Sequence, residues 1–581
     1  MTTTTVQLQH ERVDDIPLLM GFLEQMQLPT ILEKHLGSHH LHQGISNGSL
    51  MCVWLTFILS EGSHCKVHVQ DWAASRIHIL QALLKQEFRP LECSDDRLSI
   101  LLRRLHDANW KDLESNLWDA SCEVYEIPVE QCRLDATTSY GYHTIEPDGL
   151  MQRGHSKDHR PDLPQLKLMA AAALPSGCPI AVDIVPGNSA DDPLYLPLIA
   201  RVRDQLQRTG LLYAGDCKMA AIATRADIVE HDDYYLTPLP HTGETQQDFA
   251  NWVNEALDGT RSLQSSYHED EETKERTLVA VGYEFLRTCE YDEGARPVRW
   301  KERVQVVRSL ALAERKQKNL EQRLQCAEKE IRALTPPIGR GRRQFAEAES
   351  LQAAVQRILE EQDVEGLLLV SWQREERQEE RYEGRGRGGP SRARRVVTHV
   401  RYQIDEVCRD TEALEAACAR LGWRAQVTNV PQKRLGLWES VRAYNQGWSL
   451  ERDFHVLKDR PLGIQPLHVR EEEQIEGLTR LLIIALRVLT LFELVVRAKL
   501  EERDEELSGL YTGQAKRKTS RPTAVRLLRA VARMEITATR MNGTEEEGWH
   551  LTPLPPLLRQ ILELAGLPVT LYTKLATVNS G

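Results

Sequence analysis

The order of strand-like and helix-like segments between residues 128 and 240 is the feature that most constrains the fold. Three short segments with the composition of strands come first: CRLDATTSYGYH, LPQLKLMAAAAL and CPIAVDIVPG, the last two joined by a tight turn at 175–177. An amphipathic stretch from Asp191, the apolar run LLYAGDC, a second helical stretch and DYYLTPLP complete the series. This order predicts an α/β core, in which helices flank a mixed sheet.

The segments on either side of this core define the other predicted domains. Residues 1–127 repeat apolar residues at helical spacing and predict an all-α N-terminal domain. The alternation of strand-like and helix-like segments ends over 241–430. A charged helical stretch and a β-hairpin around GRGRGGPSRA there predict an α+β insertion. Residues 431–505 have the pattern of helices that belong to the core and predict its second part. The pattern over residues 506–581 predicts a helical tail with a basic segment, QAKRKTSRPTAVRLLRAVARM.

Composition excludes several classes of protein. A net charge of −12 excludes binding to nucleic acid by overall charge alone, although it is compatible with positive charge confined to one face. Eleven cysteines without a CxxC pair are typical of free thiols in a reducing compartment. The most apolar run carries Arg487 and Glu493, and predicts a buried helix rather than a membrane span. With no signal-peptide pattern, we expect a cytoplasmic protein that makes no membrane contact.

Two acidic residues occupy positions where a carboxylate is costly. Asp135 lies inside the first strand-like run, and Asp216 ends another. A carboxylate on a strand that is covered by helices loses its hydration, and a divalent cation is the usual compensation when such acids cluster. Taken singly, each acid would more often be a helix cap or part of a surface ion pair, so the prediction depends on several acids acting together.

A third acid, Glu451, lies in a helix-like stretch between an aromatic residue and a cation. Tyr444 comes seven residues before it and Lys458 seven residues after it, close to two helical turns in each direction. We therefore expect the three side chains on one face of one helix. Three carboxylates suit phosphodiester cleavage by two Mg²⁺ ions, which activate the attacking oxygen and stabilise the leaving oxygen.

With these residues in place, the chain resembles insertion-sequence transposases of the Asp-Asp-Glu class. A large group of these enzymes carries Tyr, two residues, Arg, three residues, Glu, six residues and Lys, and YNQGWSLERDFHVLK supplies Tyr444, Glu451 and Lys458 at this spacing. Trp448 also fits the group. The stretches GHSKDHRPDLPQLKLMAAAAL and IVPGNSADD resemble one subfamily, so the resemblance covers most of the chain.

The chain departs from this signature at the arginine position, which is Gly447. In the family that arginine is expected to hold a DNA phosphate. Arg442 and Arg452 are the neighbouring residues that would replace it.

The resemblance implies a fold and a reaction. The catalytic domain would be RNase H-like and split by the insertion, with residues 1–127 binding DNA or serving as an accessory domain. A homodimer would pair two transposon ends, expose a 3′-OH on each by hydrolysis and join it to target DNA, with two Mg²⁺ ions (or Mn²⁺) per site. The implied catalytic and metal-binding residues are Asp135, Asp216 and Glu451. The implied residues that contact double-stranded DNA are Tyr444, Trp448, Lys458, Lys157 and Arg160. The location would be the bacterial cytoplasm, in association with the nucleoid.

Three alternatives remain open at this point. An RNase H-like nuclease that cuts without joining would share the metal site. A decayed or domesticated transposase would only bind DNA, and Gly447 is the feature that favours it. A helical scaffold built on residues 309–362 leaves the acids on strands unexplained. The arginine-rich loop and the basic segment of the tail suit either DNA contact or a solvated surface, and Lys157 and Arg160 suit either DNA contact or a turn held by Asp158 and Asp162.

Overall fold

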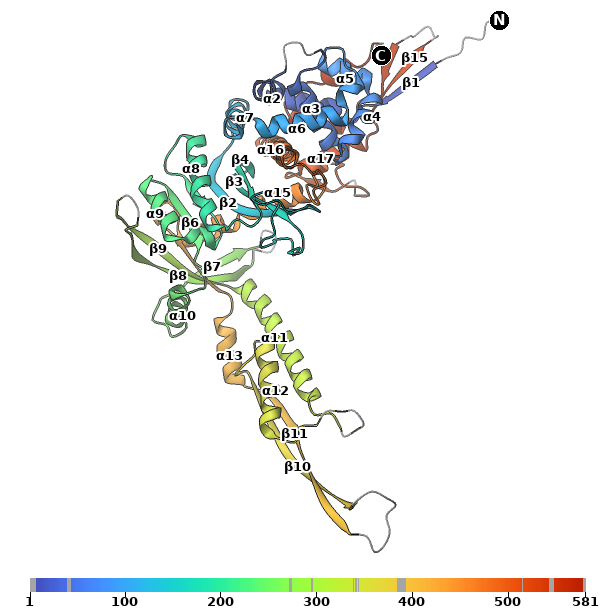
Figure 1. Ribbon diagram of the computed structural model, residues 1–581. Coiled ribbons are helices and arrows are strands. Elements are labelled where there is room, and N and C mark those ends of the chain that lie inside the picture. Colours follow the sequence, from blue (N-terminus) through green and yellow to red (C-terminus); the bar gives the residue numbers. More distant parts are fainter. Residues whose placement is uncertain are drawn as a thin grey trace. The chain divides into compact units, whose positions relative to one another are not determined.

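The structure is a computed structural model of the chain (Figure 1). It describes residues 7–38, 43–270, 274–293, 296–337, 339, 342, 344–383, 393–514, 516–542 and 548–577. These residues form two compact units. The core unit comprises 1–237, 288–300 and 428–581, and the inserted unit comprises 238–287 and 301–427.

A mixed sheet forms the centre of the core unit. Its strands are β2 (Val129–Tyr140), β3 (Gln165–Pro175), β4 (Cys178–Pro186), β5 (Leu212–Ala214) and β6 (Tyr234–Pro238). Their order across the sheet is β4-β3-β2-β5-β6. The β4–β3 and β3–β2 pairs are antiparallel, whereas the β2–β5 and β5–β6 pairs are parallel. The predicted mixed sheet is confirmed, and its strands and helices follow one another as the sequence pattern indicated.

Helices cover this sheet because its central strands are apolar on both faces. Strand β3 is buried from Gln165 to Leu174, as a continuous apolar run in a covered sheet should be. Helix α8 (Tyr195–Leu206) buries Tyr195, Leu198, Ile199 and Val202, which lie on one helical face, and packs on β3 and β4. Helix α9 (Ile222–Glu230) follows β5 and leads into β6.

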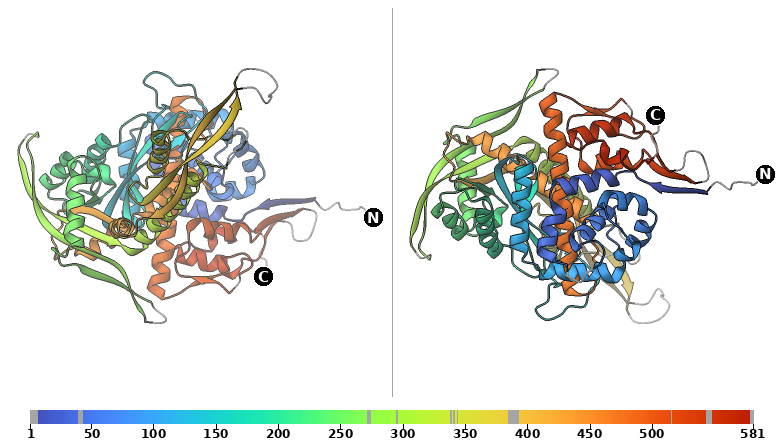
Figure 2. Two further views of the ribbon diagram at one scale, coloured as in Figure 1. Left: turned by 90° about the horizontal axis from the view of Figure 1, so that it is seen from below. Right: turned by 90° about the horizontal axis from the view of Figure 1, so that it is seen from above.

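The N-terminal part of the chain is mostly helical. Helices there are α1 (Ile16–Gln25), α2 (Leu28–Leu36), α3 (Asn47–Glu61), α4 (Val69–Ala74), α5 (Ile77–Leu84), α6 (Asp95–Asp107) and α7 (Trp110–Val124). The prediction that this region is all-α is wrong at its start, because Gln7–Arg12 form strand β1. β1 pairs antiparallel with β15 (Thr537–Asn542), near both ends of the chain (Figures 1 and 2).

The last part of the chain mixes helices and strands, so the prediction of a helical tail is also incomplete. Helices α17 (Ala524–Ala532), α18 (Pro556–Leu564) and α19 (Thr570–Thr573) are present. Strands β13 (Leu507–Ser508) and β14 (Lys518–Thr519) pair with each other, and β16 (Gly548–Leu551) pairs with β15. These strands are short and lack a long alternating pattern, so their pairing depends on partners elsewhere in the chain.

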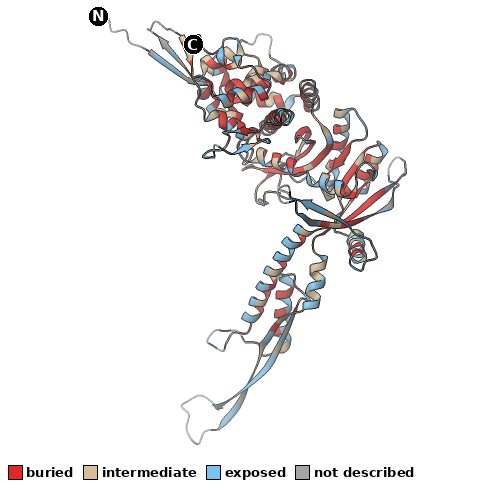
Figure 3. Cartoon of the chain, turned by 180° about the vertical axis from the view of Figure 1, so that it is seen from behind, coloured by how far each residue is buried: buried red, intermediate tan, exposed pale blue. Residues whose placement is uncertain are grey.

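Helix α16 (Glu472–Arg503) joins the parts of the core unit. It is buried over most of its length and packs on helices α3, α6, α15 (Trp448–Lys458), α17 and α18 and on β4 (Figures 2 and 3). This confirms the predicted buried helix around Arg487. No helix in the described part of the chain is long and apolar enough to cross a membrane.

The inserted unit contains a second set of strands and helices. Strands β12 (Trp423–Thr428), β9 (Val298–Ser309), β8 (Arg276–Tyr291) and β7 (Gln264–Glu269) are neighbours in that order. The helices are α10 (Glu244–Leu257), α11 (Leu310–Ala333), α12 (Ala348–Glu361) and α13 (Thr411–Arg420). The predicted hairpin is present as β10 (Leu368–Tyr382) and β11 (Arg394–Arg409), while its arginine-rich tip, 384–392, lies outside the described residues.

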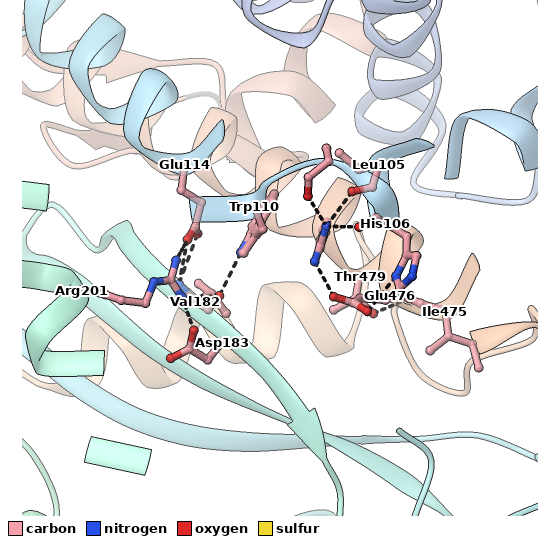
Figure 4. Close-up of polar contacts among 12 residues, drawn as sticks. Leu105, His106, Trp110, Glu114, Val182, Asp183, Arg201, Ile475, Glu476 and Thr479 are labelled. Atoms are coloured by element: carbon pink, nitrogen blue, oxygen red, sulfur yellow. Dashed lines mark hydrogen bonds and ion pairs between the residues drawn. The ribbon is translucent and has the colours of Figure 1, made fainter. Parts of the chain in front are cut away.

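Buried polar contacts tie the N-terminal helices to the sheet (Figure 4). Arg201 of α8 forms ion pairs with Glu114 of α7 and Asp183 of β4. The Glu114 carboxylate also accepts a hydrogen bond from the Val182 amide at 3.2 Å. Burial raises the pKa of Glu114 to about 7, against the opposing effect of Arg201. The guanidinium therefore stabilises a carboxylate that would otherwise be costly to bury.

A second arginine fastens α16 to the end of α6. Arg480 donates hydrogen bonds to the carbonyls of Leu105 and His106, both at 2.7 Å, and pairs with Glu476 (Figure 4). The last carbonyls of a helix have no partner within the helix, so a cation placed there satisfies them and the helix dipole together.

We expect Arg201→Met to destabilise the core unit, because it leaves the Glu114 carboxylate buried without its cation. Loss of one partner of a buried pair costs about 3–5 kcal/mol. Thermal unfolding should show a clear fall in Tm, partly restored by adding Glu114→Gln, which removes the charge. As the control, Lys499→Met disrupts the exposed pair with Glu502 and should cost less than about 1 kcal/mol. Equal effects of the two substitutions would contradict this role of Arg201.

Candidate active site

Strand register brings Asp135 and Asp216 to the same level of the sheet. β2 and β5 are adjacent and parallel, with Arg133 opposite Ala214. Asp135 and Asp216 each come two residues later, so they occupy matching positions beyond this pair. Neighbouring strands lie about 4.8 Å apart. Two of the three predicted carboxylates are therefore neighbours, with Asp135 inside β2 and Asp216 just beyond the end of β5.

The carboxylate of Asp135 is partly buried beside one cation. Its Oδ1 atom lies 3.3 Å from Lys157 Nζ and accepts a hydrogen bond from the Ala136 amide at 2.7 Å. Burial raises the pKa of Asp135, Lys157 opposes this effect, and the negative charge of Asp216 raises the pKa further. The two aspartates thus repel each other in a place where water screens them poorly, as carboxylates that share a cation do.

Asp216 is held in a fixed orientation. Tyr195 donates its hydroxyl hydrogen to Asp216 Oδ1 at 2.7 Å, and the Lys218 amide donates to the same oxygen at 2.9 Å. Burial, followed by the charge of Asp216, raises the pKa of Tyr195, so its hydroxyl remains a donor. Sequence reasoning missed Tyr195, because a tyrosine on the apolar face of a helix carries no local sign that its hydroxyl reaches a strand end.

Glu451 is exposed on helix α15 (Trp448–Lys458), which packs on β2 and β3. Among the residues that the structure describes, no three His, Cys, Asp or Glu side chains are close enough together to hold a metal ion. The structure therefore brings Asp135 and Asp216 together and leaves Glu451 outside the group.

The expectation that Tyr444, Glu451 and Lys458 share one face of one helix is wrong. Tyr444 belongs to α14 (Leu437–Asn445), and the other two residues belong to α15. A turn at residues 446 and 447 separates the two helices. It contains Gly447, and glycine has a low propensity for helix.

The space beside Gly447 is occupied by an arginine of strand β2. Arg133 of β2 is 6% exposed, and its guanidinium carbon lies 4.7 Å from the centre of the Tyr444 ring. A Cβ atom at Gly447 would lie only 2.4 Å from that carbon. The Arg133 guanidinium thus occupies the space where a side chain at residue 447 would begin.

Arg442 and Arg452, the two arginines expected to replace the one missing at residue 447, do not occupy the space beside Gly447. Arg452 forms ion pairs with Asp453 and Glu493 and lies over the Trp448 ring at 5.5 Å. Arg442 is exposed on α14. No local pattern could have indicated Arg133, because it approaches Gly447 only after the sheet and the helix have packed.

The other predicted DNA-contacting residues differ in their availability. Trp448 is 58% exposed. Lys458 Nζ lies 2.7 Å from Asp158 Oδ1, and that ion pair is largely buried. Arg160 forms two hydrogen bonds with Asp162, at 2.8 and 2.7 Å.

These ion pairs hold the loop after β2 in place. Asp158 also accepts a hydrogen bond from Thr138 of β2 at 3.1 Å, so the loop is joined both to the strand and, through Lys458, to α15. The alternative of a turn stabilised by Asp158 and Asp162 describes the contacts seen here.

The sequence matches the family model of the transposase DDE domain over residues 133–488. The chain belongs to the DDE transposase family. This confirms the resemblance and makes the protein a member of a family of enzymes that cut and join DNA. The matched segment contains Asp135, Asp216 and Glu451.

Comparison with solved structures matches this transposase to a cryo-EM structure of the piggyBac transposase synaptic complex with hairpin DNA. The sequences are 11% identical and the TM-score is 0.27. The match covers 51% of this chain and 63% of that chain, which is less than two thirds of its length. No curated protein matches the sequence.

We expect Gly447→Ala to destabilise the transposase through Arg133. Overpacking of this kind costs about 1–3 kcal/mol, whereas the same change at an unconstrained site gains about 0.4–1 kcal/mol. The sign of the change in the free energy of unfolding therefore distinguishes the two cases, and chemical denaturation measures this change. In an Arg133→Ala background the cost should disappear, giving a coupling energy between the two positions. Additive effects of the two substitutions would show that they do not compete for this space.

Proposed function

We propose that this transposase binds the inverted-repeat ends of its own insertion sequence, nicks DNA there to expose a 3′-OH, and joins that hydroxyl to target DNA by two-metal phosphodiester chemistry. The observation that carries the proposal is the placement of Asp135 on β2 and of Asp216 two residues after the adjacent parallel strand β5, inside the segment that matches the DDE family. The strand order β4-β3-β2-β5-β6 supports an RNase H-like core, in which the first aspartate lies on the first strand and the second follows the fourth.

The donors at this site fit a divalent cation. Mg²⁺ prefers oxygen ligands, and both aspartates supply carboxylate oxygens. Burial and the charge of Asp216 both raise the pKa of Asp135, and a cation shared by the two carboxylates would relieve that penalty. Asp135, Asp216 and Glu451 would hold two Mg²⁺ ions, or Mn²⁺ in their place. The ions would supply activation of the attacking oxygen and stabilisation of the leaving oxygen.

Three side chains would prepare the site for substrate. Tyr195 orients Asp216 through its hydroxyl. Lys157 balances the charge of Asp135, and its ammonium would meet a DNA phosphate beside the two aspartates. Glu451, exposed on α15, would be the third carboxylate of the ligand set.

The remaining predicted residues would position DNA. Trp448 is exposed enough to stack on a base displaced from the duplex, as in a hairpin step. Tyr444, Lys458 and Arg160 would contact the DNA near the cleaved bond, with Lys458 exchanging Asp158 for phosphate.

Each predicted domain would have its own role in the reaction. Residues 128–240 and 431–505 would form the catalytic domain, and 1–127 would recognise transposon ends. The insertion, 241–430, and the tail, 506–581, would support a homodimer that pairs two ends at the bacterial nucleoid.

Substituting any of the three acids should abolish nicking while leaving DNA binding intact. We expect Asp135→Asn, Asp216→Asn and Glu451→Gln each to lower the rate of nicking by on the order of a thousandfold, since metal-ion stabilisation is worth several kcal/mol. The measurement uses labelled DNA that carries the terminal repeats flanking the gene, with Mg²⁺.

The matched control for these substitutions is Asp459→Asn, an exposed acid just beyond α15 that should have no effect. Withdrawal of Mg²⁺ with EDTA should stop nicking by the wild type without releasing the DNA. Binding to the ends without nicking by the wild type in Mg²⁺ would instead favour a transposase relic that only binds DNA. Nicking without any joined product would favour a nuclease.

Substitution of Trp448 should affect the second strand more than the first. Stacking of one base on an aromatic ring is worth about 1–3 kcal/mol, so Trp448→Ala should weaken binding to DNA with an extruded base by that amount. A fluorescent base analogue at the flanking position would report the change, and Trp448→Phe should retain most of the signal. Unchanged fluorescence in Trp448→Ala would show that Trp448 does not stack on a displaced base. The metal site would still be tested separately by nicking of the first strand.

A further inference from the structure

A cavity lined by exposed arginines lies in the last part of the core unit. It has a volume of about 290 Å³ and lies between the segment around Tyr511 and helix α17. The charged residues that line it are Arg517, Arg526, Arg529 and Arg533. None of the described residues that line this cavity is acidic.

An aromatic ring and neutral oxygens hold three of these arginines in place, Arg517, Arg526 and Arg533. The guanidinium carbons of Arg517 and Arg526 lie 4.1 and 4.4 Å from the centre of the Tyr511 ring. Arg526 also donates a hydrogen bond to the Tyr511 hydroxyl at 3.0 Å, and Arg533 donates to the Thr512 hydroxyl. Two cations against one ring are pre-positioned, and neither is neutralised by it.

This arrangement differs from the other clustered arginines of the core unit. Arg201, Arg452 and Arg497 each contact a carboxylate of a neighbouring element or helical turn. Within the described part of the chain, none of the four cavity arginines forms an ion pair with Asp or Glu. Like charges brought together in one cavity repel, so an anion from outside the chain would stabilise the cluster.

We propose that this arginine cavity binds phosphates of the DNA backbone. Guanidinium groups form paired hydrogen bonds with phosphate oxygens, and several guanidiniums around one cavity match the closely spaced phosphates of a DNA strand. The chain carries a net charge of −12, so DNA must be held where positive charge is concentrated. The proposal rests on the proposed function insofar as the ligand is DNA, and it adds a contact made by residues other than the three acids.

The test measures how DNA binding depends on salt. Each lost phosphate contact lowers the slope of log affinity against log salt by about 0.9. We expect Arg517→Gln with Arg526→Gln to reduce this slope by about 1–2, and to weaken binding equally for terminal-repeat DNA and for unrelated duplex DNA. The protein is the full chain with Glu451→Gln, in EDTA between about 50 and 200 mM salt, so that catalysis plays no part.

The matched control removes the same charge from exposed arginines that do not line the cavity, Arg540 and Arg559. Changing both to Gln should leave the slope unaltered, and unfolding curves should show that all variants are folded. An unchanged slope in the cavity variant overturns the proposal, even when the wild-type protein, which retains Glu451, nicks DNA normally. Stabilisation of the wild type by inorganic phosphate, with no effect of the cavity variant on DNA binding, would assign the cavity to a small anion and also overturn it.

The same experiment separates this proposal from the proposed function. DNA binding with the expected loss of slope but without nicking by the protein that retains Glu451 would overturn the chemistry and support the cavity. Absence of DNA binding by the wild type would overturn both.

Discussion

The site depends on two carboxylates held side by side, that of Asp135 inside strand β2 and that of Asp216 just after the adjacent parallel strand β5. Register fixes Asp135 and Asp216 at one level, and the surrounding helices remove much of their water. Such a pair is tolerated only when donors and cations are arranged around it. Lys157 and Tyr195 perform that role from a loop and a helix outside the two strands. The position of α8 and of the loop after β2 is therefore part of the site.

Gly447 and Arg133 show how the same packing accommodates a departure from the family signature. An arginine at residue 447 would extend from the break between α14 and α15, whereas here a guanidinium reaches that break from β2 and stacks on Tyr444. A Cβ atom at residue 447 would require this guanidinium to move. The glycine that suggested a decayed enzyme therefore also has a packing reason, because the Arg133 guanidinium occupies the space beside it.

The parts of the fold that could be predicted are those encoded within a few neighbouring residues. Apolar runs and turn residues identified β2 to β6 and placed Asp135 on a strand and Asp216 at a strand end. Pairing of β1 with β15 could not be predicted, because β1 is polar and exposed and its partner lies at the other end of the chain. The Arg133 contact was missed for the same reason, and the helix break at Gly447 was missed because a seven-residue spacing suits a continuous helix as well as an interrupted one.

The distribution of charge connects the fold to an anionic substrate. The chain is acidic overall, and several of its buried arginines are neutralised within the fold, as Arg201 is by Glu114 and Asp183. Such arginines stabilise packing and have no charge left for a ligand. The cavity around Tyr511 is the opposite case, because its arginines are held by a ring and by neutral oxygens. An acidic protein of this kind attracts DNA weakly at long range, so contact depends on local sites whose positive charge the fold has left without carboxylates.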